Sequence, residues 1–338
     1  MREHVFDMLE CPECHGELEY ELTDYYDDRV ESGIAVCSDC IKEYPISEGI
    51  GIFVPEGRPV STGSFDRSAT HFTRFLHRYP ELEDRLMSVP ADQLSPADRF
   101  IRGLVLEERG EFNEARRVMS SARTDLYTAE TLHCWDSQFD FLIDSVGHDP
   151  GTVLDLSSGR CYLVETLARL TQASIIATDH DPRVLRQSQR YLRTVGLYNR
   201  VSLLAIDPCR SPFKDDSVPQ ITSFQGLQSV RDLTALIAEL RRIVSGRILS
   251  IQTFYPEGNE PNAETLRAHN MESQFFKDAF VDTMESAGLQ LALANERTAR
   301  EAPCQPGEVI QGAVVNPFPV TETRATWCTV VAKRKGAC

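Results

Sequence analysis

The sequence predicts an α/β protein in which a doubly wound, mostly parallel sheet follows a small cysteine-rich module and a helical insert. Three observations predict this. The chain has 338 residues, more than one domain usually spans. Its first 40 residues carry two C-x2-C pairs, and from residue 147 short apolar runs alternate with helical periodicity. We therefore expect a cysteine module over 1–57, a linker over 58–64, a helical insert or lid over 65–146 and an α/β domain over 147–338.

Four cysteines near the N-terminus have the spacing of a metal site. Cys11 and Cys14 form one pair, Cys37 and Cys40 form the second, and 22 residues separate the pairs. Two such turns facing each other place four thiolates around a tetrahedral Zn²⁺ with no open position for water, so we expect a structural zinc. Free thiols or a redox pair are the alternative. A module this small has too little core to fold alone, so metal binding would contribute to its folding energy.

The residues around these thiols resemble a known family. "MLECPECHGELEY" precedes "GIAVCSDCIKEYPISEGIGIFVPE", so a cysteine knuckle, a hairpin, a second knuckle and a Y-P-I-x-x-G-I strand follow in order over residues 6–55. This order is similar to the small zinc-ribbon family related to the activator subunit of tRNA, rRNA and protein methyltransferases. The resemblance implies a zinc ribbon over residues 1–57.

The charge of this ribbon limits its partners. Residues 1–60 hold four Lys and Arg against fifteen Asp and Glu, a net charge of −11 in a chain of −16. A nucleic-acid-binding ribbon needs cations that displace counterions from phosphates, so we expect no direct nucleic-acid binding by the ribbon. Its acidic residues either recruit a protein partner or only keep the module soluble.

Two further expectations concern the membrane and the insert. The chain has no run of about 18 apolar residues and no signal-peptide stretch before its first cysteines, so we expect a cytoplasmic protein without a membrane span. Over 65–146 the pattern is helical, and Ser95 and Pro96 have the residue types of an N-cap and a first helical position. This segment either shapes a substrate pocket as a lid or only packs against the domain that follows.

Three acidic residues end the first three predicted strands of the α/β domain. "TVLDL" contains Asp155, "SIIATD" ends in Asp179 and "VSLLAID" ends in Asp207. The carboxyl ends of parallel strands meet at one edge of the sheet, where such folds bind ligands. Asp179 follows Asp155 by 24 residues, the separation at which a carboxylate reaches ribose hydroxyls in dinucleotide-type sites. Asp207 is placed to accept a hydrogen bond from an adenine amino group.

Together with "SPFKDDSVPQITSFQGLQSV" and "AELRRIVSGRILSI", this ordered series resembles class I S-adenosylmethionine-dependent methyltransferases over residues 130–335. The resemblance implies a Rossmann-like sheet closed by an antiparallel strand pair, and an enzyme that takes S-adenosylmethionine as methyl donor. The cofactor-binding residues that it implies are Asp155, Ser157, Ser158, Gly159, Asp179, His180 and Asp207.

The loop after the first strand departs from that family. The family reads D-x-G-x-G-x-G, whereas this chain has Asp155, Ser157, Gly159 and Cys161 at the corresponding positions. Glycine serves there because the backbone passes close to the ligand and needs φ > 0. Serine and cysteine are small, so a methionine tail still fits above Ser157 and Ser158. The alternative is a methyltransferase-shaped scaffold that has lost its donor and recruits a partner through the acidic ribbon.

The methyl acceptor is less specified. The predicted fourth strand leads into "SFQGLQ", without the D/N-P-P-Y/F motif of nucleic-acid amino methyltransferases, so a small molecule or a peptide is favoured over RNA. Placing a nucleophile in line with a sulfonium carbon supplies much of the acceleration, so no catalytic side chain is predicted. The candidate substrate residues, each of which has an ordinary structural role as its alternative, are Gln225, Gln228, Tyr255, His133 and Trp135.

Overall fold

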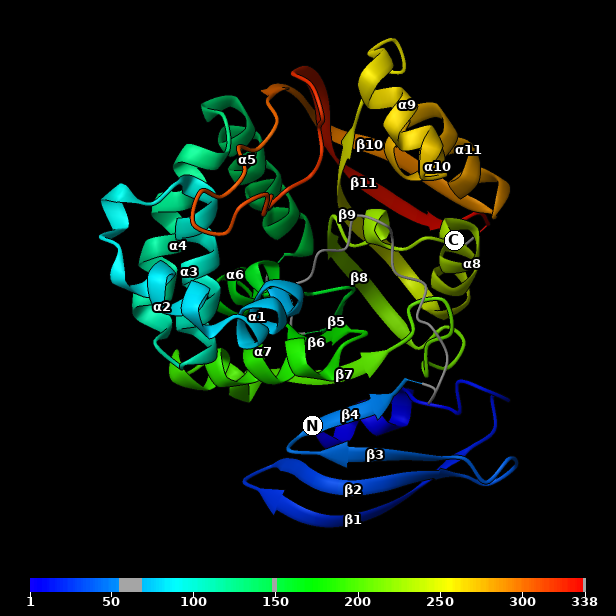
Figure 1. Cartoon of the computed structure of the whole chain (residues 1–338). Helices are drawn as coiled ribbons and strands as arrows, with labels where there is room; N and C mark the ends of the chain where they lie inside the picture. Colours follow the sequence, from blue (N-terminus) through cyan, green and yellow to red (C-terminus); the bar gives the residue numbers. More distant parts are fainter. Residues whose placement is uncertain (55–68, 148–150, 337–338) are drawn as a thin grey trace.

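The computed structural model describes residues 1–54, 69–147 and 151–336. The predicted linker 58–64 lies outside the described residues. The strands form one 11-stranded sheet with the order β1-β2-β3-β4-β7-β6-β5-β8-β9-β11-β10 (Figure 1). They are β1 (Leu18–Tyr26), β2 (Arg29–Cys37), β3 (Glu43–Ser47), β4 (Ile50–Phe53), β5 (Thr152–Asp155), β6 (Ser174–Asp179), β7 (Val201–Ile206), β8 (Val218–Phe224), β9 (Val244–Phe254), β10 (Leu289–Glu301) and β11 (Thr323–Arg334).

The α/β part of this sheet has the predicted fold class. Strands β7, β6, β5, β8 and β9 are parallel, and each pair keeps a regular register over most of its length. Strand β11 runs antiparallel to both β9 and β10, so the end of β10 and the start of β11 lie at the same edge as the end of β9. The short apolar runs of the sequence are the buried parallel strands, as expected for a sheet covered on both faces.

Helices cover both faces of the sheet. Figure 1 shows α5, α6 and α7 on one face and α8 and α11 on the other, and each face has its own apolar core. The helices are α1 (Ala69–Arg78), α2 (Pro80–Ser88), α3 (Pro96–Glu108), α4 (Phe112–Leu126), α5 (Ala129–Val146), α6 (Tyr162–Leu170), α7 (Pro182–Thr194), α8 (Leu233–Ile243), α9 (Glu260–Ala268), α10 (Glu272–Phe275) and α11 (Lys277–Ser286). None of them, within the described ranges, is long and apolar enough to cross a membrane.

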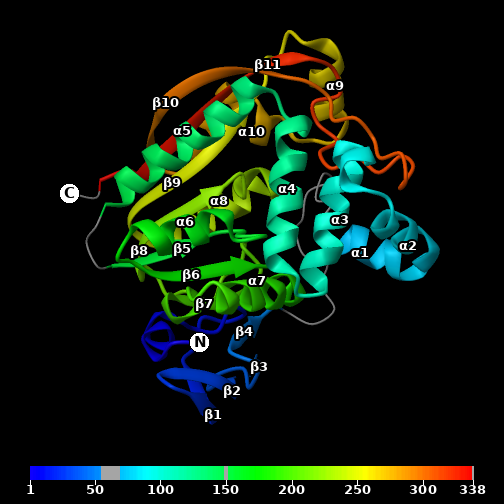
Figure 2. The ribbon, with the colours of Figure 1, turned by 90° about the vertical axis from the view of Figure 1, so that its left-hand side faces the viewer.

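The helical insert is built from α1 to α4 and continues into α5. The Ser95 hydroxyl accepts a hydrogen bond from the backbone N–H of Asp98 at 3.1 Å, which makes Ser95 the N-cap of α3. Gly110 has φ +82° in the tight turn after α3, and α3 and α4 then lie side by side beside α7 (Figure 2). Buried apolar residues of α1 to α4 form a small core together with Ile310 and Ala313 from the segment between β10 and β11.

The ribbon is joined to the α/β sheet and is not a separate unit. Its last strand, β4, pairs in parallel with β7, with Ile50 opposite Leu203 and Phe53 opposite Ile206. Arg29 is 4% exposed and donates to the carbonyls of Tyr198 at 3.1 Å and Val201 at 2.8 Å. The ribbon therefore covers an edge of the parallel sheet that would otherwise expose unpaired backbone groups.

Candidate functional site

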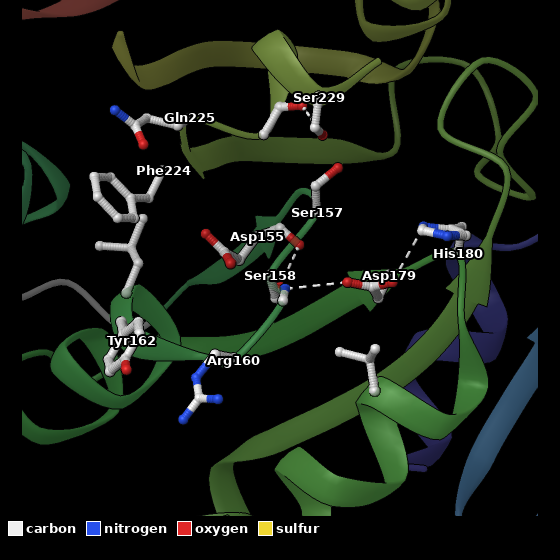
Figure 3. Close-up of a pocket in the computed structure, with 14 residues that line it drawn as sticks. Asp155, Ser157, Ser158, Arg160, Tyr162, Asp179, His180, Phe224, Gln225 and Ser229 are labelled. Atoms are coloured by element: carbon white, nitrogen blue, oxygen red, sulfur yellow. Dashed lines mark hydrogen bonds and ion pairs between the residues drawn. The ribbon is translucent and has the colours of Figure 1, made fainter. Parts of the chain in front are cut away.

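A cavity of about 310 Å³ opens at the carboxyl ends of β5, β6 and β8 (Figure 3). This volume lies at the lower end of the range for small-molecule sites, roughly 300–1,000 Å³. The cavity is lined by Asp155, Ser157, Ser158, Gly159, Arg160, Tyr162, Leu163, Asp179, His180, Val184, Phe224, Gln225, Gly226 and Ser229. Six of the seven residues predicted for the donor site are in this set, and their role in holding a donor stays a prediction.

The loop between β5 and α6 keeps a glycine-type backbone although two of its positions are not glycine. Ser157 has φ +54°, Gly159 +49° and Cys161 +58°, all in the left-handed region. These are the three alternate positions at which the family carries glycine. The loop is held in place because the N–H of Ser158 donates to the carbonyl of Thr178 at 2.7 Å. We call residues 156–161 the donor loop.

Close packing keeps this loop against β8. A Cβ atom placed on Gly226 would lie 2.8 Å from Cβ of Ser157 and 2.7 Å from the carbonyl oxygen of Leu156, which is closer than such atoms approach. Gly226 therefore permits the donor loop and the start of the segment after β8 to touch. The Ser158 hydroxyl donates to the carbonyl of Asp155 at 3.0 Å and accepts from the N–H of Thr178 at 3.1 Å.

Asp179 at the end of β6 connects the donor loop with the start of α7. Its Oδ2 accepts from the N–H of Gly159 at 3.2 Å and its Oδ1 accepts from the N–H of Asp181 at 3.0 Å. His180 lies beside it, with Nδ1 3.3 Å from Oδ1. Carboxylate oxygens accept hydrogen bonds, so hydroxyl groups of a ligand are suitable donors to Asp179.

Asp155 lies deeper, at the floor of the cavity. It is 2% exposed, and its Oδ1 accepts a hydrogen bond from the Thr222 hydroxyl at 2.8 Å. Burial raises the pKa of its carboxyl to about 6, against the smaller opposing effect of hydrogen bonds from Ser158 and Thr222.

Arg160 connects the donor loop with the insert. Its guanidinium donates to the carboxylate of Glu107 on α3, and its buried Nε and Nη1 have no hydrogen-bond partner among the residues that the structure describes. The insert therefore contacts one wall of the cavity. Sequence reasoning missed Arg160, because a lone arginine in a loop has no distinctive pattern.

A second cavity of about 90 Å³ adjoins the first through Gln225, which lines both. The other residues that line this second cavity are Tyr127, Thr128, Thr131, Trp135, Tyr255, Glu301, Ala302, Cys304, Asn316, Pro319 and Trp327. It lies where β9 and β10 end and β11 begins. Two of its side chains, Tyr255 and Trp135, and the shared Gln225 are candidates from the sequence.

Three other sequence candidates lie elsewhere. Asp207 is at the expected edge but lines neither cavity; its Oδ1 accepts from the N–H of Cys209 at 3.0 Å. Gln228 is buried and donates to the carbonyls of Thr253 and Gln274, a structural arrangement away from both cavities. His133 is exposed on α5 and is also outside both linings. These three residues differ from the expectation for one reason. The order of elements in the sequence predicts which edge of the sheet a residue reaches, but it does not predict the direction of its side chain.

The four predicted metal ligands come together in the ribbon. Among the described residues, the Sγ atoms of Cys11, Cys14, Cys37 and Cys40 all lie within 4.8 Å of one another, with 3.6 Å between Cys11 and Cys40 and 3.4 Å between Cys14 and Cys37. Tetrahedral zinc with bonds of about 2.3 Å places its sulfurs roughly 3.8 Å apart. The cluster therefore fits a four-thiolate zinc site.

Comparisons with known proteins agree with this architecture. Residues 153–246 match the model of a methyltransferase domain family. A ubiquinone/menaquinone biosynthesis C-methyltransferase of Shewanella halifaxensis is 29% identical over 122 residues, which are 35% of this chain and 49% of that protein. The chain thus spans about half the length of the curated relatives that it matches.

Among solved structures, the YcgJ protein from Bacillus subtilis is similar, with 14% identity, a TM-score of 0.48 and coverage of 60% of this chain and 100% of that chain. The matched segment 153–246 begins in β5 and ends in β9, so it contains the donor loop, Asp179 and the parallel strands around the larger cavity. Residues 153–246 are therefore similar to a methyltransferase domain, and the mostly parallel sheet that contains them has a Rossmann-like strand order.

Proposed function

We propose that the chain is an S-adenosylmethionine-dependent methyltransferase that acts on a small molecule or a peptide and binds no nucleic acid through its ribbon. The observation that carries this proposal is the backbone of the donor loop. Ser157, Gly159 and Cys161 all adopt left-handed φ values, so the loop keeps the shape of a glycine loop. A non-glycine residue in that region costs on the order of 1 kcal/mol or more, and such strain is typical of functional sites.

The residues around the larger cavity suit such a donor. In this proposal the carboxylate of Asp179 accepts hydrogen bonds from ribose hydroxyls, since it lies at the strand end expected for that contact. Arg160 lines this cavity, and its guanidinium suits a carboxylate such as that of a methionine tail. When bound, S-adenosylmethionine supplies an electrophilic methyl group on its sulfonium. The chain's own residues orient donor and acceptor and exclude water.

We further propose that the four cysteines hold one structural zinc ion. All four ligand positions are thiolates, so no position remains for water or substrate. The ribbon strands stand at one end of the strand order of the sheet, and β10 stands at the other end. None of the described ribbon residues lines either cavity, which supports a structural role for the zinc ion. Thiolate ligands also suit a reducing compartment such as the cytoplasm.

The donor site is tested by binding of S-adenosylhomocysteine, measured by calorimetry and by thermal shift. We expect binding to the wild-type chain, and an Asp179→Ala variant should bind at least about tenfold more weakly, because a hydrogen bond to a charged group contributes roughly 1.5–3 kcal/mol. Asp181→Ala is the matched control. Asp181 is the N-cap of α7 and does not line the cavity, so its loss should lower stability slightly and leave binding unchanged.

Two outcomes would contradict the proposal. No stabilisation of the wild-type chain by ligand far above ~100 µM would favour the scaffold alternative. Equal binding by wild type and Asp179→Ala would place the donor elsewhere in the chain.

A further inference from the structure

The second cavity has an unusual chemical composition. Four aromatic side chains line it, Tyr127, Trp135, Tyr255 and Trp327, together with one carboxylate, Glu301. Among the described residues that line it there is no Lys, Arg or His. The cavity is therefore aromatic and negatively charged when Glu301 is ionised.

Glu301 is buried without a cation beside it. It is 7% exposed, its Oε2 accepts from the Tyr255 hydroxyl at 2.6 Å, and its Oε1 accepts from Nε1 of Trp327 at 2.8 Å. Both donors are neutral, and no ion pair in the described ranges reaches this carboxylate. Two hydrogen bonds leave about two of its four acceptor positions unfilled. Buried carboxylates are ordinarily paired with a cation, so this one lacks its usual partner.

The aromatic side chains of this cavity also suit a bound cation. A cation over the face of tryptophan or tyrosine gains about 0.5–2 kcal/mol, and aromatic cages with this composition recognise alkylammonium groups. Trp135 already attracts one cation, since the guanidinium of Arg123 lies 4.7 Å from its ring centroid while Arg123 is not part of the cavity lining. Tyr255 contributes both a ring and, through its hydroxyl, the orientation of Glu301.

We propose that this second cavity is the acceptor subsite and that it binds the ammonium group of a small amine, with Glu301 as the counter-ion and the aromatic side chains as the cage. This inference rests on the proposed methyltransferase function and names its substrate class. The cavity of about 90 Å³ is well below the roughly 300–1,000 Å³ of sites that enclose a whole drug-sized ligand, so it admits a head group and not a whole large substrate.

The position of the cavity supports this assignment. Glu301 ends β10, Tyr255 follows β9 and Trp327 lies near the start of β11, so all three are at the edge where the larger cavity also opens. Gln225 belongs to both linings, and Trp135 packs 4.8 Å from Phe224 of the larger cavity, measured between ring centroids. A donor in one cavity and an amine in the other would therefore be neighbours.

Glu301 can also accept the proton that the ammonium group must lose before the methyl transfer. A primary, secondary or tertiary ammonium has no free lone pair until it loses a proton. That N–H proton moves to an oxygen of Glu301, so a cation and an anion become a neutral amine and a neutral carboxylic acid. Burial raises the pKa of Glu301 above its ordinary value, despite the hydrogen bonds from Tyr255 and Trp327, which favours this transfer.

The two tryptophans of the chain, Trp135 and Trp327, both line this cavity, so intrinsic fluorescence reports on its occupation. The probes are choline, which carries a trimethylammonium group, and its neutral isostere 3,3-dimethylbutan-1-ol. We expect choline to change the fluorescence and to bind at least tenfold more tightly than the neutral isostere. This comparison uses the wild-type chain and stands whether or not any variant folds.

A charge-neutral variant sharpens the test. Glu301→Gln should lose at least tenfold in choline affinity and little or nothing for the neutral isostere. Glu296→Gln is the matched control, since Glu296 is on the same strand but exposed and paired with Lys277 at 2.6 Å outside the cavity. It should bind choline as the wild type does.

The outcomes separate this inference from the function on which it rests. Equal binding of choline and its isostere, or no binding of either, overturns the ammonium subsite even if S-adenosylhomocysteine binds. Tight binding of the isostere would instead favour a neutral acceptor with Glu301 as base. Choline binding through Glu301 in a chain that does not bind S-adenosylhomocysteine would keep the subsite and overturn the methyltransferase proposal.

Discussion

The cysteine knuckles of the ribbon and the donor loop both hold non-glycine residues in left-handed conformations, but by different means. In the knuckles, His15 has φ +61° and Ile41 +58°, each directly after the second cysteine of its pair. The two knuckles also share a hydrogen-bond pattern, because the N–H of His15 donates to the carbonyl of Cys11 at 2.9 Å and that of Ile41 to Cys37 at 3.0 Å. In the donor loop, Ser157 packs against Gly226 in the segment after β8, and the N–H of Cys161 donates to the carbonyl of Ser158 at 2.8 Å.

This difference has an energetic consequence. The knuckles belong to a small module, and in our zinc proposal a single metal ion completes their set of four thiolate ligands. The donor loop sits on a buried parallel sheet, where many hydrogen bonds and close contacts share the constraint. Removal of one ligand or of the metal should therefore unfold the knuckles, whereas removal of one contact should only weaken the donor loop.

The largest expected effect is on the knuckles. Cys37→Ser, or removal of metal by a chelator, should lower the free energy of unfolding of the ribbon by about 4–5 kcal/mol or more, the range in which loss of a metal site falls. We expect one zinc per wild-type chain by atomic emission. Hydrogen exchange should show loss of protection in β1 to β4, and also in β7, because β4 covers that edge.

Cys209→Ser provides the matched control for this experiment. Cys209 is a partly exposed thiol outside the four-cysteine cluster, so its loss should leave metal content and protection unchanged. A Cys37→Ser chain that keeps full protection in β1 to β4 would show that the knuckles do not depend on metal.

The same contrast explains how much could be predicted from the sequence. The four ligands were predicted because their spacing is local: each pair lies within one turn of chain. The donor loop was predicted less fully, because Ser157 and Cys161 replace the glycines that identify it. Glu301 was missed altogether, since "ANERTARE" alternates like an exposed strand and only the pairing of β10 with β11 and the segment after it bury this residue.

The sequence pattern also does not predict that the ribbon pairs with the α/β sheet. The strand "IGIF" is short and apolar, which fits a strand within the ribbon as well as one that extends a second sheet. The pairing of this strand with the α/β sheet depends on the edge of β7 and on Arg29. Arg29 donates to two carbonyls that lie 169 and 172 residues later in the chain. Such contacts have no local signal.

A smaller effect is expected at Asp155, beneath the donor loop. Burial raises the pKa of this carboxyl in the folded chain to about 6 from 3.8. The folded state therefore holds the proton more tightly than the unfolded state, and this contribution to the free energy of unfolding is fully present below pH 3.8 and is lost as the pH rises through about 6. Wild type should lose roughly 3 kcal/mol relative to Asp155→Asn between pH 4 and pH 7. Urea unfolding at several pH values measures this difference.

Asparagine is the suitable replacement because its Oδ1 can still accept the hydrogen bond from Thr222. The stabilities of the two chains should converge at low pH, where Asp155 is protonated. A difference between them that stays constant from pH 4 to pH 7 would show that Asp155 does not titrate in this range.

The smallest expected effect is at Ser157, within the donor loop itself. Ser157→Gly removes the left-handed strain at φ +54°, on the order of 1–2 kcal/mol, but adds freedom to the unfolded chain worth about 0.5–1 kcal/mol. The net change should be a stabilisation of at most about 1.5 kcal/mol, with S-adenosylhomocysteine bound as well as before or more tightly. Thermal unfolding and calorimetry measure both.

The neighbouring serine separates backbone strain from a general effect of glycine. Ser158 is not in the left-handed region, and its hydroxyl both donates to the carbonyl of Asp155 and accepts from the N–H of Thr178. Ser158→Gly should therefore destabilise the chain by about 1–3 kcal/mol, because the N–H of Thr178 loses this partner, whereas the carbonyl of Asp155 keeps the hydrogen bond from the Thr178 hydroxyl at 2.9 Å. If Ser157→Gly were as destabilising as Ser158→Gly, the serine side chain at 157 and not its backbone would shape the loop, and the likeness to a glycine loop would carry no functional meaning.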